Sequence, residues 1–333
     1  MTDSDNDSVF AQESAPPRES YSRLFLRFLR FGFMAWGGPV AQIAMIRQEL
    51  VEEEKWISRE RFNRILAVYQ ILPGPEAQEL CVYFGFLARG RLGGILGGLG
   101  FMLPGFVLMM LLSWLYVTYG ITSPLLIAAF AGMQAAVGAL IVRAVHRIGN
   151  HVLHDRWTWA IAAIAALAQL AGINFLVILL VAGVTYFLVE RGGTTFAAGI
   201  LTISLIGIII TGYQLLAGNS TGLESIVNTT QGQTTIPALF GSGLRSGLLT
   251  FGGAYTVIPY LRHDAVIVGN WMTGSQFLDG LALSGILPAP LVIFGTFVGY
   301  LGSGFAGGVA LTAGIFLPAF AFTLIGHQYV ERL

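Results

Sequence analysis

Cysteine, lysine and charge in general are scarce in this chain of 333 residues. Cys81 is the only cysteine, which excludes an intramolecular disulfide, a cysteine-based zinc site and redox catalysis by a cysteine pair. Charged residues make up 11% of the sequence, and 17 of the 18 cations are Arg. These arginines lie at the ends of apolar segments and form no single basic face, so we expect no nucleic-acid partner.

The motifs of common enzymes are missing as well. The sequence has no phosphate-binding loop, no His-Glu-x-x-His and no cluster of cysteine and histidine, so we expect no enzymatic activity, no cofactor and no metal ion. Residues 1–20 hold five acids and two prolines but lack the apolar core of a signal peptide. This composition predicts a disordered cytoplasmic tail.

Apolar residues make up 55% of the chain, and the mean hydropathy is +0.71. Crossing ~30 Å of hydrocarbon takes about 20 apolar residues in a helix. Four uncharged stretches are long enough: 92–117, 124–142, 195–216 and 305–325. Residues 157–189 carry Gly172-Ile173-Asn174 at their middle, which predicts two short spans with a turn between them. We therefore predict an all-α, multi-pass protein of the cytoplasmic (plasma) membrane, with the lipid bilayer as its solvent.

The sequence contains an internal repeat. Residues 29–75 align without a gap with residues 244–290, a displacement of 215 residues, and 16 of the 47 positions are identical. After a deletion of one residue, Gly93-Gly94 and Leu103-Pro104 match Gly307-Gly308 and Leu317-Pro318. Self-similarity over this length indicates a duplicated folding unit. We predict a first repeat over 21–191, a connecting span and polar loop over 192–235, and a second repeat over 236–333.

Charge separates the two copies. Residues 46–64 hold five cations, whereas the equivalent residues 261–279 hold only Arg262, and residues 192–244 hold none. Short cytoplasmic loops are enriched in Lys and Arg, so equivalent segments are expected on opposite sides of the membrane, as inverted repeats. The second copy lacks a counterpart of the span 124–142, so we expect it to be short by a final helix, either by evolution or by truncation of the chain. A partner protomer is then expected to cover the exposed face, giving a homodimer.

Four glycine- and proline-rich breaks occupy repeat-related positions. Cations flank the two breaks of the first copy on both sides, which predicts re-entrant hairpins whose tips meet near the membrane midplane. Irregular backbone at that depth is tolerated only in protein or beside water, so the tips are candidate lining for a solute path. The alternative is a kink in each of four continuous helices. The tips are Gly37-Gly38-Pro39, Pro73-Gly74-Pro75, Gly252-Gly253 and Pro288-Ala289-Pro290.

Charged residues near the breaks favour an anion as the solute. A helix that begins after a break directs free amides and a positive dipole end at the break. Two pairs of equivalent arginines, Arg30 with Arg245 and Arg47 with Arg262, could grip an oxyanion in bidentate fashion. The alternative is anchoring at the membrane interface or pairing with nearby glutamates. Glu76 and Glu79 beside the first tip are candidate proton carriers, because ionisable groups at membrane depth are commonly functional.

Between the first two tips, the segment 52–64 predicts an amphipathic helix at the membrane interface. Glutamates and Lys55 precede Trp56, and Ser58 stands where an N-cap is expected. This places the Trp56 ring among the lipid headgroups.

These motifs resemble the chromate transporter family. Trp36-Gly37-Gly38-Pro39 is similar to the family's Phe-Gly-Gly-Pro motif. The resemblance covers residues 24–333, and three positions depart from the family pattern: Trp36 replaces Phe, Ala289 replaces Gly, and Glu76 stands where many members have Asn. The further matching motifs are Leu72-Pro73-Gly74-Pro75, Leu103-Pro104-Gly105-Phe106, Phe251-Gly252-Gly253 and Pro288-Ala289-Pro290.

The resemblance implies efflux of chromate across the cytoplasmic membrane in competition with sulfate, with resistance to chromate as the result. Alternating access between the inverted repeats is the expected mechanism. Two alternatives stay open. The chain could be a carrier of sulfate or another inorganic anion, or a membrane scaffold or sensor that transports nothing.

Overall fold

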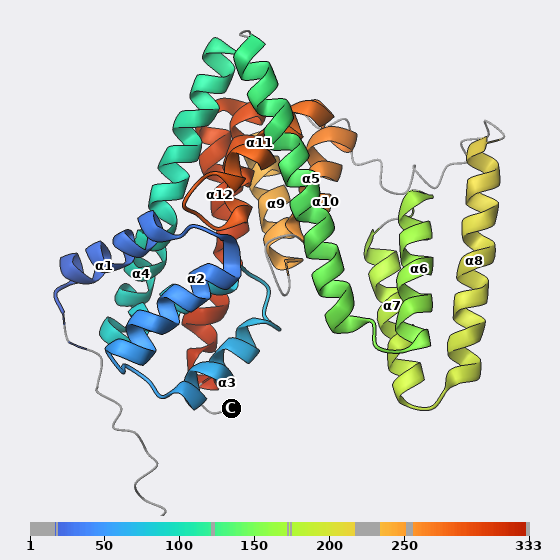
Figure 1. Cartoon of the computed structure of the whole chain (residues 1–333), viewed down its shortest axis with the longest axis horizontal. Helices are drawn as coiled ribbons and strands as arrows, with labels where there is room; N and C mark the ends of the chain where they lie inside the picture. The colour runs from blue at the N-terminus through green and yellow to red at the C-terminus, as the bar shows by residue number, and fades with distance from the viewer. Residues whose placement is uncertain are drawn as a thin grey trace, which may run out of the picture. The chain divides into compact units, whose positions relative to one another are not determined.

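The computed structural model describes residues 17, 19–120, 124–171, 173, 175–216, 234–250 and 256–330, and every regular element in them is a helix (Figure 1). The chain forms two compact units, Met1–Val137 with Gln231–Leu333, and Gly138–Thr230. The first unit contains α1 (Tyr21–Met34), α2 (Gly38–Arg47), the π-helix η1 (Gln48–Glu53), α3 (Arg59–Tyr69), α4 (Glu76–Tyr119), the start of α5 (Pro124–Val152), α9 (Ile236–Leu248), α10 (Val257–Arg262), the π-helix η3 (His263–Val268), α11 (Gly274–Gly285), the 3-10 helix η4 (Leu291–Ile293) and α12 (Phe294–Val330). The second unit contains the rest of α5, α6 (Arg156–Leu170), α7 (Phe175–Glu190) and α8 (Thr194–Leu216).

Three of the described segments are long and apolar enough to cross a membrane: Glu76–Tyr119, Thr194–Thr211 and Leu291–His327. The predicted pair of helices within 157–189 is confirmed as α6 and α7. Together with the hydropathy of the chain, these helices define an all-α, multi-pass membrane protein, as the composition predicted.

Both α4 and α12 are hairpins of two helices. The backbone leaves helical geometry at Arg89 and Gly90 in α4, and at Ser303 and Gly304 in α12. A Cβ atom built on Gly85 would lie 2.3 Å from the carbonyl oxygen of Gly93, although residues eight apart in a continuous helix are about 12 Å apart. The chain therefore reverses direction. We call 76–88 and 294–302 the short arms, and 91–119 and 305–330 the long arms.

The two copies of the repeat fold alike. The π-helices η1 and η3 occupy equivalent residues, and each is followed by a left-handed residue, Lys55 (φ 54°) and Asn270 (φ 50°). Ser58 and Thr273 then cap α3 and α11 by accepting a hydrogen bond from the amide three residues on, so the predicted Ser58 cap is confirmed. The arms of the two hairpins meet through Gly85 and Gly93 in one copy, and through their equivalents in the other.

The long arms of α4 and α12 pack against each other in opposite directions (Figure 1). Gly94 lies against Leu324, Gly98 against the ring of Phe320, and Gly308 against Met110, so residue numbers rise along one arm as they fall along the other. The repeat equates Gly94 with Gly308 and Met110 with Leu324. The first and last contacts are therefore the same contact made twice, as a two-fold relation between the copies requires.

Each proline-rich tip packs on the long arm of the other copy. The tip at Gly74 contacts Ala319 of α12, and the tip at Ala289 contacts Gly105 of α4. These contacts are again equivalent, and each joins one glycine to one alanine. A Cβ atom built on Gly105 would lie 2.2 Å from the Cβ atom of Ala289, so the departure at Ala289 is accommodated by the absence of a side chain across the contact.

In the second unit, α6, α7 and α8 pack side by side (Figure 1). Asp155 begins α6 with a capping box, in which its carboxylate accepts a hydrogen bond from the amide of Thr158 at 2.7 Å. This hydrogen bond lowers the pKa of Asp155, because it stabilises the charged form. The three helices enclose an apolar pocket of about 180 Å³ lined by side chains such as Ile164, Ile178 and Ile208.

The prediction that Trp56 lies among lipid headgroups is wrong. Its side chain is 2% exposed, packs edge-on against Phe84 and donates its indole N–H to Glu54 at 2.7 Å. The reason is local, because η1 ends at Glu53 and the left-handed conformation of Lys55 turns the chain toward the core. The segment therefore consists of two helices with a turn between them.

The contact of Gly105 with Ala289 predicts that Gly105→Ala destabilises the protein by about 1–3 kcal/mol through overpacking. The second substitution Ala289→Gly should restore most of this loss, since it removes the opposing methyl group. The measurement is the midpoint of thermal unfolding of each purified variant. Gly132→Ala is the matched control, because no atom lies within 4 Å of a Cβ atom built there. A double variant no more stable than Gly105→Ala contradicts the packing described.

Candidate functional site

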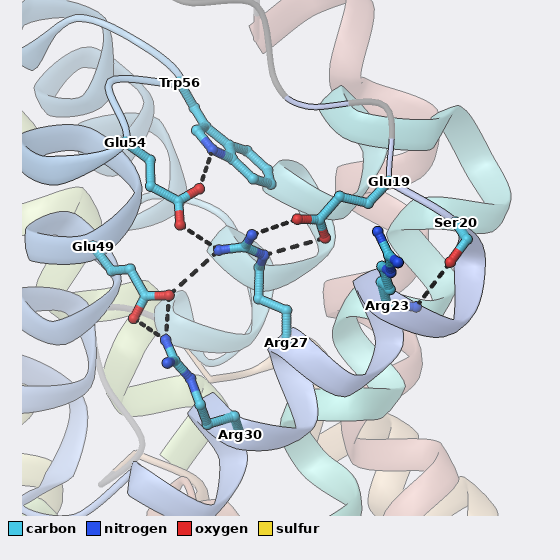
Figure 2. A network of polar contacts seen from close by, with 8 residues as sticks. All are labelled: Glu19, Ser20, Arg23, Arg27, Arg30, Glu49, Glu54 and Trp56. Atoms are coloured by element: carbon cyan, nitrogen blue, oxygen red, sulfur yellow. Dashed lines mark hydrogen bonds and ion pairs between the residues drawn. The ribbon is translucent and has the colours of Figure 1, made fainter.

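A network of ion pairs ties α1 to η1 (Figure 2). The guanidinium of Arg27 contacts Glu19 and Glu54 at 2.5 Å each and Glu49 at 3.4 Å, and it lies 5.6 Å from the centre of the Trp56 ring. Arg30, one helical turn later, donates to both carboxylate oxygens of Glu49. Two arginines of one helix therefore meet three carboxylates at this end of the first copy.

The second copy repeats one of these ion pairs. Arg245 donates to the carboxylate of Asp264, which also accepts a hydrogen bond from Ser242 at 2.6 Å and lies 3.3 Å from the ring of His263. Arg245 is equivalent to Arg30, and Asp264 is equivalent to Glu49. Sequence identity did not reveal the acidic partner, because the two copies use different acids. A comparison of charge at equivalent positions could have found it.

The other predicted pair of arginines differs between the copies. Arg47 contacts Glu52 at 3.1 Å, and Glu52 also accepts a hydrogen bond of 2.6 Å from Arg59. Arg262 is exposed and makes no ion pair with another residue described in the structure. Of the four candidate arginines, three are thus held by carboxylates, and Arg262 has no carboxylate partner among the described residues.

The structure describes three of the four predicted tips. Gly37 (φ 89°) and Gly38 (φ 78°) adopt conformations that favour glycine, and α2 begins there with Pro39 in its first turn. Gly252 and Gly253 lie outside the described residues. The other two tips, Pro73-Gly74-Pro75 and Pro288-Ala289-Pro290, are buried in protein. The amide of Gly74 donates to the carbonyl of Thr250 at 2.9 Å, which joins the first copy's tip to the second copy.

Glu76 and Glu79 lie in the first turn of α4, directly after the buried tip. Their side chains are 5% and 0% exposed, and neither oxygen of Glu79 has a hydrogen-bond partner among the described residues. One oxygen of Glu79 faces Gly74, within 3.0 Å of where a Cβ atom would stand. None of the four candidate arginines is paired with either glutamate in the described part of the chain. An unpaired carboxylate at this depth is costly unless it binds a proton or a cation.

These features define a class of protein. The chain is a multi-pass helical membrane protein in which two similar copies interlock through buried, interrupted helices, with ionisable side chains beside the interruptions. Such interruptions line the solute paths of membrane transporters.

Comparison with known proteins identifies the family. The family model described as "Chromate transporter" matches residues 22–188 and 237–333, and the chain belongs to the chromate transporter family. A "Chromate transport protein" of Pseudomonas aeruginosa is 56% identical over 96% of this chain and 76% of its own length. A "Probable chromate transport protein" of Synechococcus elongatus is 30% identical over 95% of this chain and 78% of its own length. No solved structure matches. The chain is therefore a membrane transporter and no enzyme.

The two equivalent ion pairs predict unequal effects on stability. Arg245→Gln should cost about 2 kcal/mol, less than the ~3–5 kcal/mol of a fully buried pair, because Arg245 is 50% exposed while Asp264 is 8% exposed. Arg30→Gln should cost about 1 kcal/mol or less, because Glu49 is more exposed and keeps its contact with Arg27. Thermal unfolding midpoints measure both, with Arg262→Gln as the control expected to change nothing. A larger loss for Arg30→Gln than for Arg245→Gln contradicts this ranking.

Proposed function

We propose that this protein exports chromate across the cytoplasmic membrane by alternating access between two inverted repeats. The observation that carries the proposal is the ion pair built twice, Arg30 with Glu49 and Arg245 with Asp264. The relatives named as chromate transport proteins supply the substrate class. Chromate and sulfate are both tetrahedral dianions, so a site made of guanidinium groups accommodates both, and sulfate is the expected competitor.

In this proposal, the carboxylates occupy the arginines while the solute is absent. A guanidinium binds a carboxylate and a tetrahedral oxyanion through the same pair of N–H groups. An arriving dianion therefore competes with Glu49 at Arg30 and with Asp264 at Arg245. Arg262, which has no carboxylate partner among the described residues, is the guanidinium most readily available for first contact.

In the proposed transport cycle, the proline-rich tips move with the copies. Each proline-rich tip packs on the long arm of the other copy, so a shift of one copy against the other displaces both tips together. The tips are Pro73-Gly74-Pro75 and Pro288-Ala289-Pro290. Gly37, Gly38 and Pro39, with Gly252 and Gly253, form the other proposed walls of the solute path. Glu76 and Glu79 beside the first tip are proposed to bind a proton that accompanies or alternates with the dianion.

The antiparallel packing of the two long arms supports an inverted arrangement in the membrane. When equivalent helices that span the bilayer run in opposite directions, the two-fold axis between them lies in the membrane plane. The short arm of α4 likewise supports the re-entrant course. It leads back from the tip, so the start of α3 and the turn at Arg89–Gly90 would lie on the same side of the membrane.

The inverted arrangement predicts the side of the membrane on which equivalent residues lie. Glu60 and Ser275 are exposed, equivalent positions in the first turns of α3 and α11. In a Cys81→Ser background, an impermeant maleimide should label the Ser275→Cys variant in intact cells and the Glu60→Cys variant only after permeabilisation. Arg91→Cys should behave as Glu60→Cys does. If Glu60→Cys and Ser275→Cys are labelled from the same side, the inverted repeat is wrong. If Glu60→Cys and Arg91→Cys are labelled from opposite sides, the re-entrant course is wrong.

Uptake of labelled chromate and labelled sulfate into proteoliposomes tests the function itself. Arg47→Gln and Arg262→Gln should each raise the chromate concentration for half-maximal uptake about tenfold or more, as expected for a lost hydrogen bond between charged groups. Arg59→Gln is the control, since Arg59 pairs with the same Glu52 as Arg47 but has no equivalent cation in the other copy. Uptake of sulfate alone favours the sulfate carrier, and uptake of neither anion favours the scaffold.

A further inference from the structure

Asp279 on α11 is a buried carboxylate outside the site described above. Four acids are buried in the described residues, namely Glu76, Glu79, Asp264 and Asp279. Asp264 has Arg245 as its partner, and Glu76 and Glu79 flank the first tip. Asp279 is 4% exposed and makes no ion pair with any described residue. It therefore needs a separate explanation.

Two neutral side chains from different helices converge on Asp279. The hydroxyl of Tyr116, near the end of α4, donates to Oδ2 at 2.7 Å, and the amide of Gln134, on α5, donates to Oδ1 at 2.6 Å. The ring of Tyr116 is held in turn by the ring of Phe297, with 5.0 Å between ring centres. All of these residues belong to the first compact unit. The carboxylate is thus fixed in place, yet its charge is not neutralised.

No charged side chain in the described part of the chain forms an ion pair with Asp279. Of the elements packed against α11, α4 presents Tyr116, α12 presents Phe297, and η4 contains only apolar residues. Gln134 does not titrate, and Asp279 is the only charged residue of α11. A carboxylate in such a setting is stable once it binds a cation from outside the protein. A proton fits better than a metal ion, because the described residues hold no cluster of three metal-binding side chains.

The repeat argues that this carboxylate is not required for packing. Asp279 is equivalent to Arg64 of α3, a residue of opposite charge that is exposed. The same folding unit therefore accepts either charge at this position. The two copies differ in what packs over this position, because α5 and the last turns of α4 bury Asp279. Tyr116 and Gln134 are themselves only partly buried, so Asp279 is one hydrogen bond away from the surface of this unit.

We propose that Asp279 is a proton-binding site through which proton movement is coupled to movement of the anion, with Tyr116 and Gln134 as positioning residues. The proposal rests on the proposed transport function and adds a second carboxylate site, on the second copy, to that of Glu76 and Glu79. Protonation would cancel the charge that the neutral donors leave, and release would restore it as the copies move against each other.

Two assays on the full-length protein in proteoliposomes test the proposal. Chromate counterflow at equal pH on both sides needs no net proton movement, whereas uptake driven by an imposed pH gradient does. Asp279→Asn should keep counterflow within about twofold of the wild type and lose the pH-gradient drive by about tenfold or more. Arg64→Gln, at the equivalent position of the first copy, should change neither. The double variant Glu76→Gln with Glu79→Gln should lose the same drive through the first site.

The outcomes separate this proposal from the transport function. Absence of chromate counterflow in the wild type overturns the function. Counterflow with an undiminished pH-gradient drive in Asp279→Asn overturns the site, as does an equal loss of both activities, which assigns Asp279 to packing. If Asp279→Asn does not fold, Tyr116→Phe decides. Removing one of the two hydrogen bonds to the carboxylate should change the pH dependence of the drive, and an unmoved pH profile rejects the site.

Discussion

Each proline-rich tip packs on the long arm of the other copy, and this reciprocal contact holds the two copies together. Lipid cannot satisfy broken backbone, so an interrupted helix in a bilayer must be covered by protein or face a water-filled cavity. Gly74 against Ala319 and Ala289 against Gly105 provide this cover, with one methyl group at each contact. Space for a single methyl explains why glycine and alanine exchange places between the copies. It also fixes the position of both tips against the long arms, and thereby the position of the glutamates that follow the first tip.

Electrostatics divides the ionisable groups into two sets. Arginines toward the ends of α1 and α9 are matched with Glu49 and Asp264, so their charges are balanced and partly hydrated. The carboxylates of Glu79 and Asp279 have no cation among the described residues. A membrane protein retains such groups at a cost in stability, which is reasonable where their charge changes during the transport cycle. The paired arginines suit an exchange of anions, whereas the unpaired carboxylates suit binding of protons.

Much of this arrangement could be predicted from the sequence, since it follows from periodic or repeated signals. Hydropathy predicted the three long apolar helices, the proline and glycine breaks predicted helix ends, and the Ser58 cap followed from a local motif. Long-range contacts could not be predicted from the sequence. The burial of Trp56 depends on the left-handed turn at Lys55, and the partner of Arg245 is an acid nineteen residues away that no identity in the repeat marks. Asp279 was overlooked because its partners come from α4 and α5, far away in the sequence.

The difference between the copies carries a further consequence for transport. A perfectly symmetric pair of inverted repeats would present the same groups to both sides of the membrane, and a bound proton would have no preferred partner in either state. The burial of Asp279 beneath Tyr116 and Gln134, set against the exposed Arg64 at the equivalent position, breaks this symmetry. In the proposed transport cycle, the two states of the carrier would therefore differ in how they hold a proton. The gradients of the proton and the anion would set the direction of net transport, and the asymmetry would decide which groups hold the proton in each state.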